Sequence, residues 1–273
     1  MHSEEIALDP LFFTKSIKGA DKKSIVKVFM QMDIDEFCSI FFDRAEQSLQ
    51  LLQADNLIKK NFGGVYAHQI VSKECQHRSE REEEFLTVGL EVRRSIQESF
   101  GTMVKGEPLD GENKWQCEKC DKKVRAEKML TLKSLPSTLI LTLKRFEFNY
   151  EVDVKIKINE YCEFPHQLNL REYSQQHINQ SEEELPPEYF LYELKGVVVH
   201  TGSADSGHYY SFINTSESSW FEFNDSHVSP FDPKDIPDET FGSKDPVDER
   251  VKNAYLLFYQ RVSQPTKEEG EEE

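Results

Sequence analysis

The amino-acid sequence predicts an α+β fold in which a helical N-terminal part precedes a larger, mainly antiparallel sheet. Two observations support this class. Apolar residues recur at helical spacing between residues 23 and 56, and from Trp115 onward they alternate at the period of two that is typical of strands. A run of strands after a helical segment is the pattern of an α+β chain rather than of a parallel α/β sheet.

The helical part is predicted as one long helix over residues 23–56, with a break near Asp33. A second, short helix is predicted over residues 95–104. Its first turn carries Ser95 and Glu98, which have the spacing of a capping box.

Residues 61–80 are predicted to form a Gly turn, a strand and a knuckle-like turn. Further strands are predicted where apolar and polar residues alternate between turn signals, and the principal segments are 84–92, 129–149 with Pro136 as an interruption, 154–165, 189–202, 207–213, 220–225 and 253–262. Residues 171–187 are polar and poor in apolar side chains, so we expect them to form a surface insertion. No internal repeat is present.

Length and charge limit the function classes. The 273 residues can bury a sizeable core in one large domain or two small ones. The net charge of −17 argues against nucleic acid as a partner and suits a basic protein or peptide, although acidity also serves solubility. No apolar stretch of membrane-spanning length and no signal pattern is present, so no membrane partner is expected. Five cysteines without a secretory signal predict a reducing cytoplasmic or nuclear compartment.

The segment SADSGHYYSF places a histidine directly after a glycine at the head of a predicted strand. This strand and the following WFEFND segment are predicted to be the two arms of a hairpin. One register, which sets Phe212 against Trp220, places His208 opposite Asn224. A register shifted by one residue places it opposite Asp225 instead.

Directly opposed side chains in a hairpin lie within reach of an imidazole-to-amide or imidazole-to-carboxylate hydrogen bond. Neighbours along a strand point to opposite faces, so only one of Asn224 and Asp225 can orient His208 directly. A histidine held in this way is the base that a thiol or hydroxyl nucleophile requires. Gly207 fits this hypothesis because no side chain there would block an extended substrate backbone. The alternative is an ordinary strand-end histidine in a sheet.

Several segments, taken together, resemble the ubiquitin-specific proteases, a papain-like family of cysteine proteases. ELKGVVVHTGSADSGHYYSFI with WFEFNDSHVS resembles the histidine box, and QMDIDEF resembles a signature helix. LPSTLILTLKRFEFN, KINEYCEFPHQLNL and LDGENKWQCEKC resemble two further strands and the entry into the second zinc knuckle. These segments cover about residues 25–260 in the family's order. CQHRSE and VKGEPLDGEN are similar to the very large fat-facets-like branch.

The resemblance implies a papain-like fingers, palm and thumb architecture with an incomplete thumb. The expected parts are a weakly patterned segment 1–24, a helical thumb remnant at about 25–60, fingers at about 63–135, a palm at about 136–262 and a disordered acidic tail 263–273. The resemblance also implies ubiquitin and ubiquitinated proteins as partners, and hydrolysis of the (iso)peptide bond after ubiquitin's C-terminal glycine, with no cofactor needed for catalysis.

In that family frame His208 is the catalytic base. Asn224 corresponds to the third member of the triad, and Asp225 to the adjacent acid that assists in many members. The loop that contains Asp205, Ser206 and Gly207 would cover the ubiquitin tail, and an acidic domain suits that tail because it carries arginines.

The family's nucleophile lies in a box resembling Gly-Leu-x-Asn-x-Gly-Asn-Thr-Cys, and no segment before Gln31 resembles this box. We expect Cys38, in an apolar helix, to be buried and unreactive. Cys162 is predicted in a strand and has no basic motif partner. The sequence therefore predicts a base and an orienter without a nucleophile, in a protease fragment that is inactive as given. The alternative is a non-catalytic ubiquitin-binding or scaffold module.

A structural zinc ion is a further possibility. Cys117 and Cys120 have the Cys-x-x-Cys spacing with which two thiolates chelate one tetrahedral ion. The matching turn SKEC supplies Cys75, but it has Ser72 where the family pattern has a second cysteine, and a neutral hydroxyl is a poor zinc ligand.

His77 or His68 could supply the fourth ligand, although spacing alone positions neither of them. The alternative is a ribbon that has lost its metal and is held by strand pairing. A zinc-ribbon nucleic-acid binder is a third hypothesis, and the net charge disfavours it.

Overall fold

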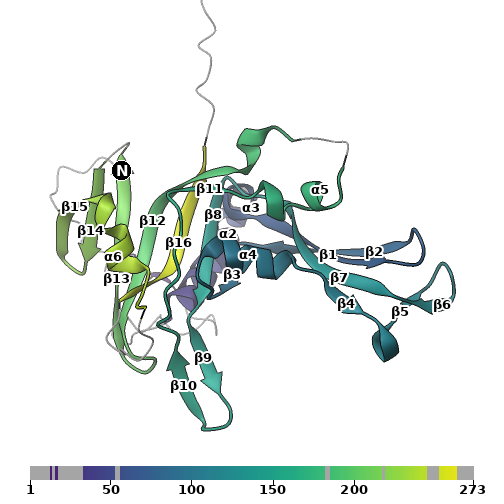
Figure 1. Ribbon diagram of the computed structural model, residues 1–273. Coiled ribbons are helices and arrows are strands. Elements are labelled where there is room, and N and C mark those ends of the chain that lie inside the picture. The colour runs from purple at the N-terminus through teal and green to yellow at the C-terminus, as the bar shows by residue number, and fades with distance from the viewer. Residues whose placement is uncertain are drawn as a thin grey trace, which may run out of the picture. The chain divides into compact units, whose positions relative to one another are not determined.

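The computed structural model describes residues 13, 16, 17, 33–52, 56–181, 185–216, 219–244 and 252–262. The chain divides into two compact units, Met1–Lys60 and Asn61–Glu273 (Figure 1). The predicted acidic tail 263–273, and segment 1–24 apart from residues 13, 16 and 17, lie outside the described residues. Among the helices that are described, none combines the length and the apolarity needed to cross a bilayer.

The first unit contains helix α2, Ile34–Leu51. Its N-cap is Asp33, whose Oδ1 accepts the backbone N–H of Asp35 at 2.8 Å and that of Glu36 at 3.3 Å. A carboxylate that takes up these free N–H groups favours a helix start here, so the break predicted near Asp33 is observed as a helix N-terminus. Residues 23–32 of the predicted helix lie outside the described residues. The short helix α3, Leu57–Phe62, spans the boundary between the units.

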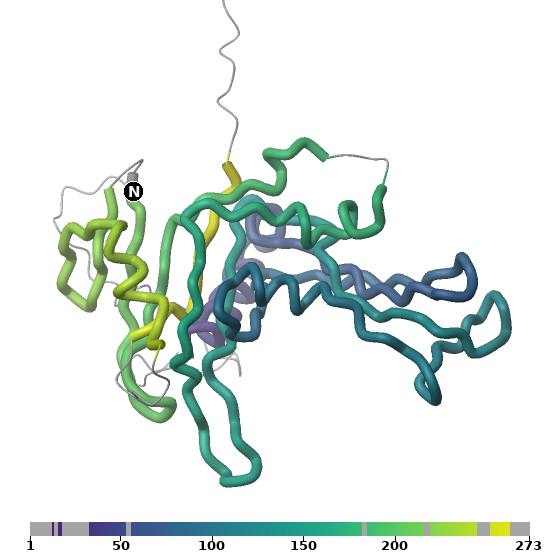
Figure 2. Tube along the Cα trace, viewed as in Figure 1, coloured from purple at the N-terminus to yellow at the C-terminus, as the bar shows by residue number. Residues whose placement is uncertain are grey.

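The second unit contains a four-stranded sheet with the order β2-β1-β7-β4. A separate two-stranded ribbon pairs β5 with β6, and both elements extend away from the larger sheet of the same unit (Figures 1 and 2). The strands are β1 Gly64–Ser72, β2 Arg78–Phe85, β4 Glu107–Leu109, β5 Trp115–Cys117, β6 Lys122–Val124 and β7 Ala126–Ser134.

The larger sheet has eight strands. Its order is β15-β14-β13-β12-β16-β8-β3, with β11 paired to β12, and every pair except β3–β8 is antiparallel. The strands are β3 Val88–Glu91, β8 Thr138–Lys144, β11 Gln167–Asn169, β12 Leu191–Gly202, β13 Gly207–Ser216, β14 Ser219–Asn224, β15 His227–Phe231 and β16 Asn253–Arg261. The hairpin of β9 Phe146–Asn149 and β10 Val154–Lys157 projects beside it (Figure 1). The predicted α+β class with mainly antiparallel sheets is confirmed.

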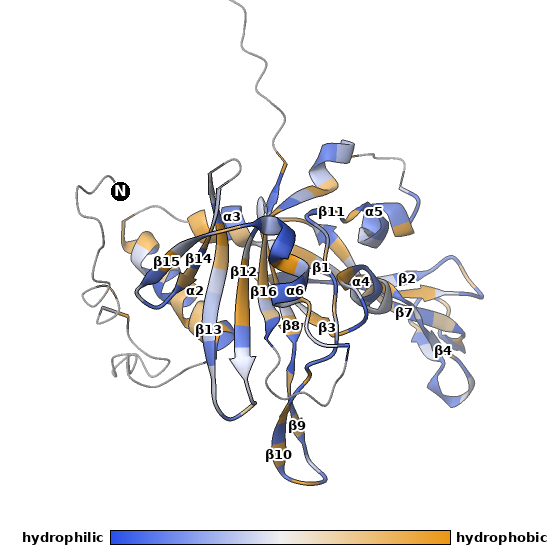
Figure 3. Cartoon of the chain, turned by 60° about the vertical axis from the view of Figure 1, so that its left-hand side comes forward, coloured by the Kyte–Doolittle hydropathy of each residue, from blue (hydrophilic) through white to orange (hydrophobic). Residues whose placement is uncertain are grey.

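The hydrophobic core lies over the central strands of this sheet, where β12 and β16 carry much of the apolar surface (Figure 3). Helix α4, Ile96–Val104, buries Ile96 and Phe100 against it. The Ser95 hydroxyl caps this helix by accepting the Glu98 N–H at 3.2 Å, as the sequence predicts. The remaining helices are α5 Gln175–Ile178, α6 Ile236–Thr240 and 3-10 turns at Gly111–Asn113, Arg171–Tyr173, Pro187–Phe190 and Pro233–Asp235.

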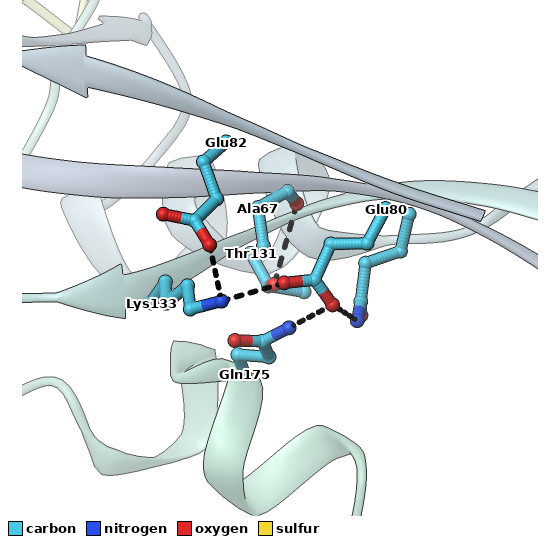
Figure 4. A network of polar contacts seen from close by, with 7 residues as sticks. Ala67, Glu80, Glu82, Thr131, Lys133 and Gln175 are labelled. Atoms are coloured by element: carbon cyan, nitrogen blue, oxygen red, sulfur yellow. Dashed lines mark hydrogen bonds and ion pairs between the residues drawn. The ribbon is translucent and has the colours of Figure 1, made fainter. Parts of the chain in front are cut away.

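The segment 171–187 is more than the surface insertion that its polarity predicts. Tyr173 is buried and stacks on Phe100 with ring centroids 5.0 Å apart. Gln175 donates a hydrogen bond of 2.7 Å to Glu80 on β2, and Glu80 also accepts from Lys133 on β7 (Figure 4). A single buried aromatic ring and one amide thus anchor a polar segment to two other elements, a contact that composition does not reveal.

Arg145 is the largest fully buried side chain that is polar. Its Nε donates to the Ala254 carbonyl at 2.7 Å, and Nη1 donates to the carbonyls of Ile158 and Glu160, both at 2.9 Å. Burial lowers the pKa of this guanidinium to about 10. One side chain therefore joins the end of β8 to β16 and to the segment after β10.

We expect Arg145→Met to lower the free energy of unfolding by about 2–4 kcal/mol, because three carbonyls lose their donor while the cost of burying the charge is relieved. Urea denaturation measures this change. Lys144→Met, at the exposed last residue of β8 directly before Arg145, is the control and should stay within about 0.5 kcal/mol of the parent. If Arg145→Met changes the free energy of unfolding as little as Lys144→Met does, the structural role of Arg145 is contradicted.

Candidate active site and metal centre

His208 is the second residue of β13. It pairs with Thr201 of β12, and Gly207 pairs with Gly202, so a tight turn over residues 203–206 directly precedes it. A glycine is required at Gly202, because its φ of +108° belongs to the left-handed region and a Cβ would lie 2.6 Å from the Ser206 carbonyl oxygen. Asp205 and Ser206 are exposed in this turn.

The His208 ring is held by an amide. His208 Nε2 lies 2.7 Å from Asn224 Oδ1, and Asn224 Nδ2 donates to Glu222 Oε1 at 3.1 Å. The Glu222 carboxylate can only accept hydrogen bonds, so it directs the Asn224 amide with its oxygen toward the imidazole. Nε2 must then carry the proton of a neutral ring, which leaves Nδ1 with a free lone pair.

Both predicted registers of the hairpin are wrong: the one that pairs Phe212 with Trp220 differs from the observed register by two residues, and the shifted alternative differs by one. Trp220 faces Asn214 instead of Phe212. Because a strand has a period of two, a shift of two residues keeps every side chain on its face. Asn224 therefore still shares a face with His208, but it reaches the ring diagonally rather than from the directly opposite position.

Asp225 stands in a different environment. It lies in the two-residue turn between β14 and β15, with a φ of +53°, and its side chain is 81% exposed. Its nearest carboxylate oxygen is 3.9 Å from His208 Nε2. At this distance a direct hydrogen bond is not made, so the geometry assigns orientation of the ring to Asn224 and leaves Asp225 a longer-range electrostatic contact.

Glu222 is a residue that the sequence analysis missed. It precedes Asn224 by two positions on β14, which places both side chains on one face of the strand. This i, i+2 spacing from Asn224 is the only signal in the sequence that could have indicated the role of Glu222. The spacing is uninformative until the contact between Asn224 and His208 is known.

A second histidine lies beneath the first. The His200 ring is buried, and its Nε2 would lie 2.2 Å from a Cβ at Gly207. Gly207 is therefore a close-packing position, and room for a substrate backbone there stays a prediction. Burial, followed by the neighbouring Lys157 and His208, lowers the pKa of His200 to about 4.

The free energy of unfolding should therefore fall in acid through His200. Below its ordinary pKa of 6.5 the unfolded chain takes up a proton that the folded chain refuses until about pH 4. The contribution is complete above pH 6.5, and about 3 kcal/mol is lost as the pH falls to 4. Urea titrations between pH 7.5 and 4.5 should show a shallower acid loss in His200→Asn than in the parent. Parallel curves for the two proteins would contradict this assignment.

The cysteines of the second unit lie in two other places. Cys162 is fully buried in the core, which raises the pKa of its thiol. Cys75, Cys117 and Cys120 gather where the β1–β2 turn meets the β5–β6 ribbon. In the first unit, burial and then the carboxylates of Asp35 and Asp33 raise the pKa of Cys38 to about 11. A buried thiol with a raised pKa forms little thiolate and is a poor nucleophile.

The three turn cysteines form a cluster with His77. Ligand atoms of Cys75, His77, Cys117 and Cys120 all lie within 4.8 Å of one another. The Cys75–Cys117 sulfur separation is 3.9 Å, and His77 Nδ1 is 3.4 Å from the Cys117 sulfur and 3.2 Å from that of Cys120. A tetrahedral zinc ion with bonds of about 2.0–2.3 Å separates its ligands by about 3.5–3.8 Å, so this Cys3His set fits zinc.

The fourth position of the cluster is thus that of His77. The sequence leaves His77 and His68 open as alternatives for this ligand, and the structure brings His77 to the cysteines. Ser72 instead stabilises the turn, since its Oγ accepts the N–H groups of Glu74 at 3.1 Å and Cys75 at 3.0 Å. His68 is engaged elsewhere, with Nε2 3.1 Å from Glu83 Oε2. The Ser72 hydroxyl and the His77 backbone are the largest causes that lower the pKa of Cys75 to about 6.

The α+β chain combines a mainly antiparallel palm-like sheet, a projecting sheet with a Cys3His cluster, and a His–Asn pair on a hairpin. This is the architecture of a papain-like protease domain. The chain belongs to the ubiquitin carboxyl-terminal hydrolase family, whose model matches residues 1–259.

Its relatives include human ubiquitin carboxyl-terminal hydrolase 24, with 35% identity over 93% of this chain. Drosophila melanogaster probable ubiquitin carboxyl-terminal hydrolase FAF is 33% identical over 86% of it. A solved structure of the SAGA DUB module Ubp8/Sgf11/Sus1/Sgf73 bound to monoubiquitin contains a similar chain, with a TM-score of 0.71 and 29% identity over 87% of this chain. The chain spans 11% and 10% of the two relatives and 50% of the chain in the solved structure.

Proposed function

We propose that this chain carries His208 as the general base and Asn224 as the orienting residue of a deubiquitinase-type domain, whose reaction is hydrolysis of the bond after ubiquitin's C-terminal glycine. As given, the chain is inactive because it has no nucleophile. The observation that carries the proposal is the 2.7 Å contact between His208 Nε2 and Asn224 Oδ1, held by Glu222. Membership of the hydrolase family and the likeness to a chain solved with monoubiquitin support ubiquitin and ubiquitinated proteins as partners.

The tautomer of His208 sets the direction of proton transfer. With Nε2–H donated to Asn224, Nδ1 takes the proton of an incoming thiol, and the thiolate attacks the carbonyl carbon of ubiquitin's last glycine. The protonated ring then gives that proton from Nδ1 to the leaving amine as the bond to it breaks. Nδ1 next accepts a proton from the water that hydrolyses the thioester, which releases the carboxylate and the enzyme thiol.

No cysteine of this chain is suited to be the attacking thiol. Cys38 and Cys162 have raised pKa values, and the other three belong to the Cys3His cluster. We therefore expect the purified 273-residue protein not to react with an electrophilic ubiquitin probe. Robust labelling would contradict this, and mass mapping of the adduct would identify the thiol responsible.

A non-catalytic ubiquitin-binding or scaffold module is the second candidate, and the placement of the cysteines favours it. It predicts ubiquitin binding that is insensitive to His208→Ala, and no turnover when a nucleophile is added. The catalytic proposal predicts instead that an appended Gly-Leu-x-Asn-x-Gly-Asn-Thr-Cys box gives hydrolysis that depends on His208. The two candidates therefore differ in one assay.

The Cys3His cluster is proposed as a structural zinc site. Zinc bound to Cys75, His77, Cys117 and Cys120 would cross-link the β1–β2 turn to the β5–β6 ribbon, and four protein ligands leave no open position for chemistry. All five cysteines are free of disulfides, which supports a reducing compartment such as the cytoplasm or nucleus.

A further inference from the structure

The turn that precedes His208 has few bonds of its own. The Ser203 N–H donates to the Ser206 carbonyl at 2.8 Å, and the Ser206 N–H donates to Ser203 Oγ at 3.3 Å. Asp205 and Ser206 are exposed. The Ser203 hydroxyl also donates to the Ser206 carbonyl at 3.2 Å. These three bonds between Ser203 and Ser206 shape the turn, but they do not fix its position on the rest of the sheet.

Lys157 supplies contacts from a distant part of the sequence. It is the last residue of β10, and its Nζ donates to the carbonyls of His200 and Gly202, both at 3.1 Å. These carbonyls belong to the last residues of β12, immediately before the turn. The ammonium group has three donors in a compact head, so it can bind two carbonyls of one strand end at once.

The same hairpin also contacts the His200 ring. Phe146 pairs with Lys157 across β9 and β10, and its ring meets the His200 ring edge-on with centroids 5.0 Å apart. His200 in turn lies against Gly207, where no Cβ could fit. The β9–β10 hairpin therefore holds the strand end before the turn through Lys157, and the residue after the turn through Phe146 and His200.

We propose that Lys157 is a positioning residue that holds the β9–β10 hairpin against the turn before His208, so that the hairpin and the turn beside the base form one body. The proposal rests on the proposed function and deepens it, because the turn borders the base. Burial, followed by the charge of Arg145, lowers the pKa of Lys157 to about 8, which is in keeping with an ammonium enclosed by the two elements that it joins.

The first test uses the unaltered chain. Lys155 lies two residues earlier on the same face of β10 and is exposed, so it is the internal control. In ¹⁵N NMR of the lysine side chains at neutral pH, the Nζ of Lys157 should show a high order parameter and slow proton exchange, and that of Lys155 should show neither. Equal mobility of the two ammonium groups would overturn the proposal.

The second test compares Lys157→Met with Lys155→Met, which remove the same group from the two positions. In Lys157→Met, amide hydrogen exchange of residues 202–207 should rise roughly tenfold or more, while that of β1 and β7 stays at the parent level. Ubiquitin binding should weaken in the same variant, and Lys155→Met should match the parent in both readouts. If amide exchange at residues 202–207 is unchanged in Lys157→Met, Lys157 does not hold the turn and the proposal is refuted. If Lys157→Met does not fold, the ¹⁵N NMR of the lysine side chains in the unaltered chain decides.

These results separate the proposal from the function on which it rests. If the parent chain shows no ubiquitin binding, the proposed function fails, while side-chain order at Lys157 and exchange at residues 202–207 still decide whether Lys157 holds the turn. If the parent binds ubiquitin and Lys157→Met loosens the turn without weakening binding, Lys157 holds the turn but the position of the turn does not affect binding, and the positioning role is overturned.

Discussion

Replacement of His208 by alanine is expected to lower the hydrolysis of a ubiquitin substrate by roughly 10³-fold in a chain that carries the appended nucleophile box. The imidazole is the group that takes the thiol proton and returns it to the leaving amine, and no other described side chain is bonded to the Asn224–Glu222 pair in its place. Initial rates with a fluorogenic ubiquitin conjugate measure the effect.

The neighbouring residues supply the matched controls. Asn224→Ala should cause a smaller but clear loss, because the ring keeps its basicity and loses its orientation. Asp225→Ala should have a weaker effect than Asn224→Ala, since its carboxylate is exposed and 3.9 Å from the ring. A larger loss at Asp225 than at Asn224 would contradict the assignment of the orienting residue.

Loss of the metal is the second large effect. Purified protein should contain about one zinc ion per chain, and Cys117→Ser should remove most of it and lower the thermal midpoint by roughly 10 °C or more. The physical reason is that Cys117 is fully buried within the cluster. The small β5–β6 ribbon has too little hydrophobic core to be stable alone, so bound zinc would stabilise its fold. Elemental analysis and thermal denaturation with and without a chelator measure both quantities.

His77 and His68, the two histidines that the sequence offers as fourth ligand, give a sharp control for this prediction. His77→Ala should lose zinc, whereas His68→Ala should retain it, because His68 contacts Glu83 and not the cysteines. Equal zinc content in the two variants would show that His77 is not a ligand. A metal-free parent with an unchanged melting midpoint in chelator would exclude the structural role.

The period of strands explains what the sequence predicts of the hairpin and what it leaves open. Alternation shows that only one of Asn224 and Asp225 can share a face with His208, but the choice between them depends on the register. The observed register, with Trp220 paired to Asn214, is accompanied by an irregularity between Asn214 and Ser216, near the hairpin turn. Such an irregularity has no signature in the alternation itself.

The roles of residues that act through contacts in space could not be predicted from the sequence. His77 lies two positions after Cys75, outside the Cys-x-x-Cys pattern, and only the fold of the Ser72 turn brings its Nδ1 to the thiols. Glu222 and Lys157 were not predicted at all. Glu222 acts on the Asn224 amide two residues along its own strand, and Lys157 acts on two carbonyls of another strand. Amino-acid type alone does not show such contacts.

The central claim is that Asn224 holds His208 with its proton on Nε2, ready to accept a proton at Nδ1. Nitrogen-15 NMR of the histidine rings, with His208 assigned from a His208→Gln sample, tests this in the chain as it stands. We predict that the neutral ring carries its proton on Nε2 in the parent, and that this preference weakens in Asn224→Ala. A proton on Nδ1 in the parent, or an unchanged spectrum in Asn224→Ala, would contradict the account.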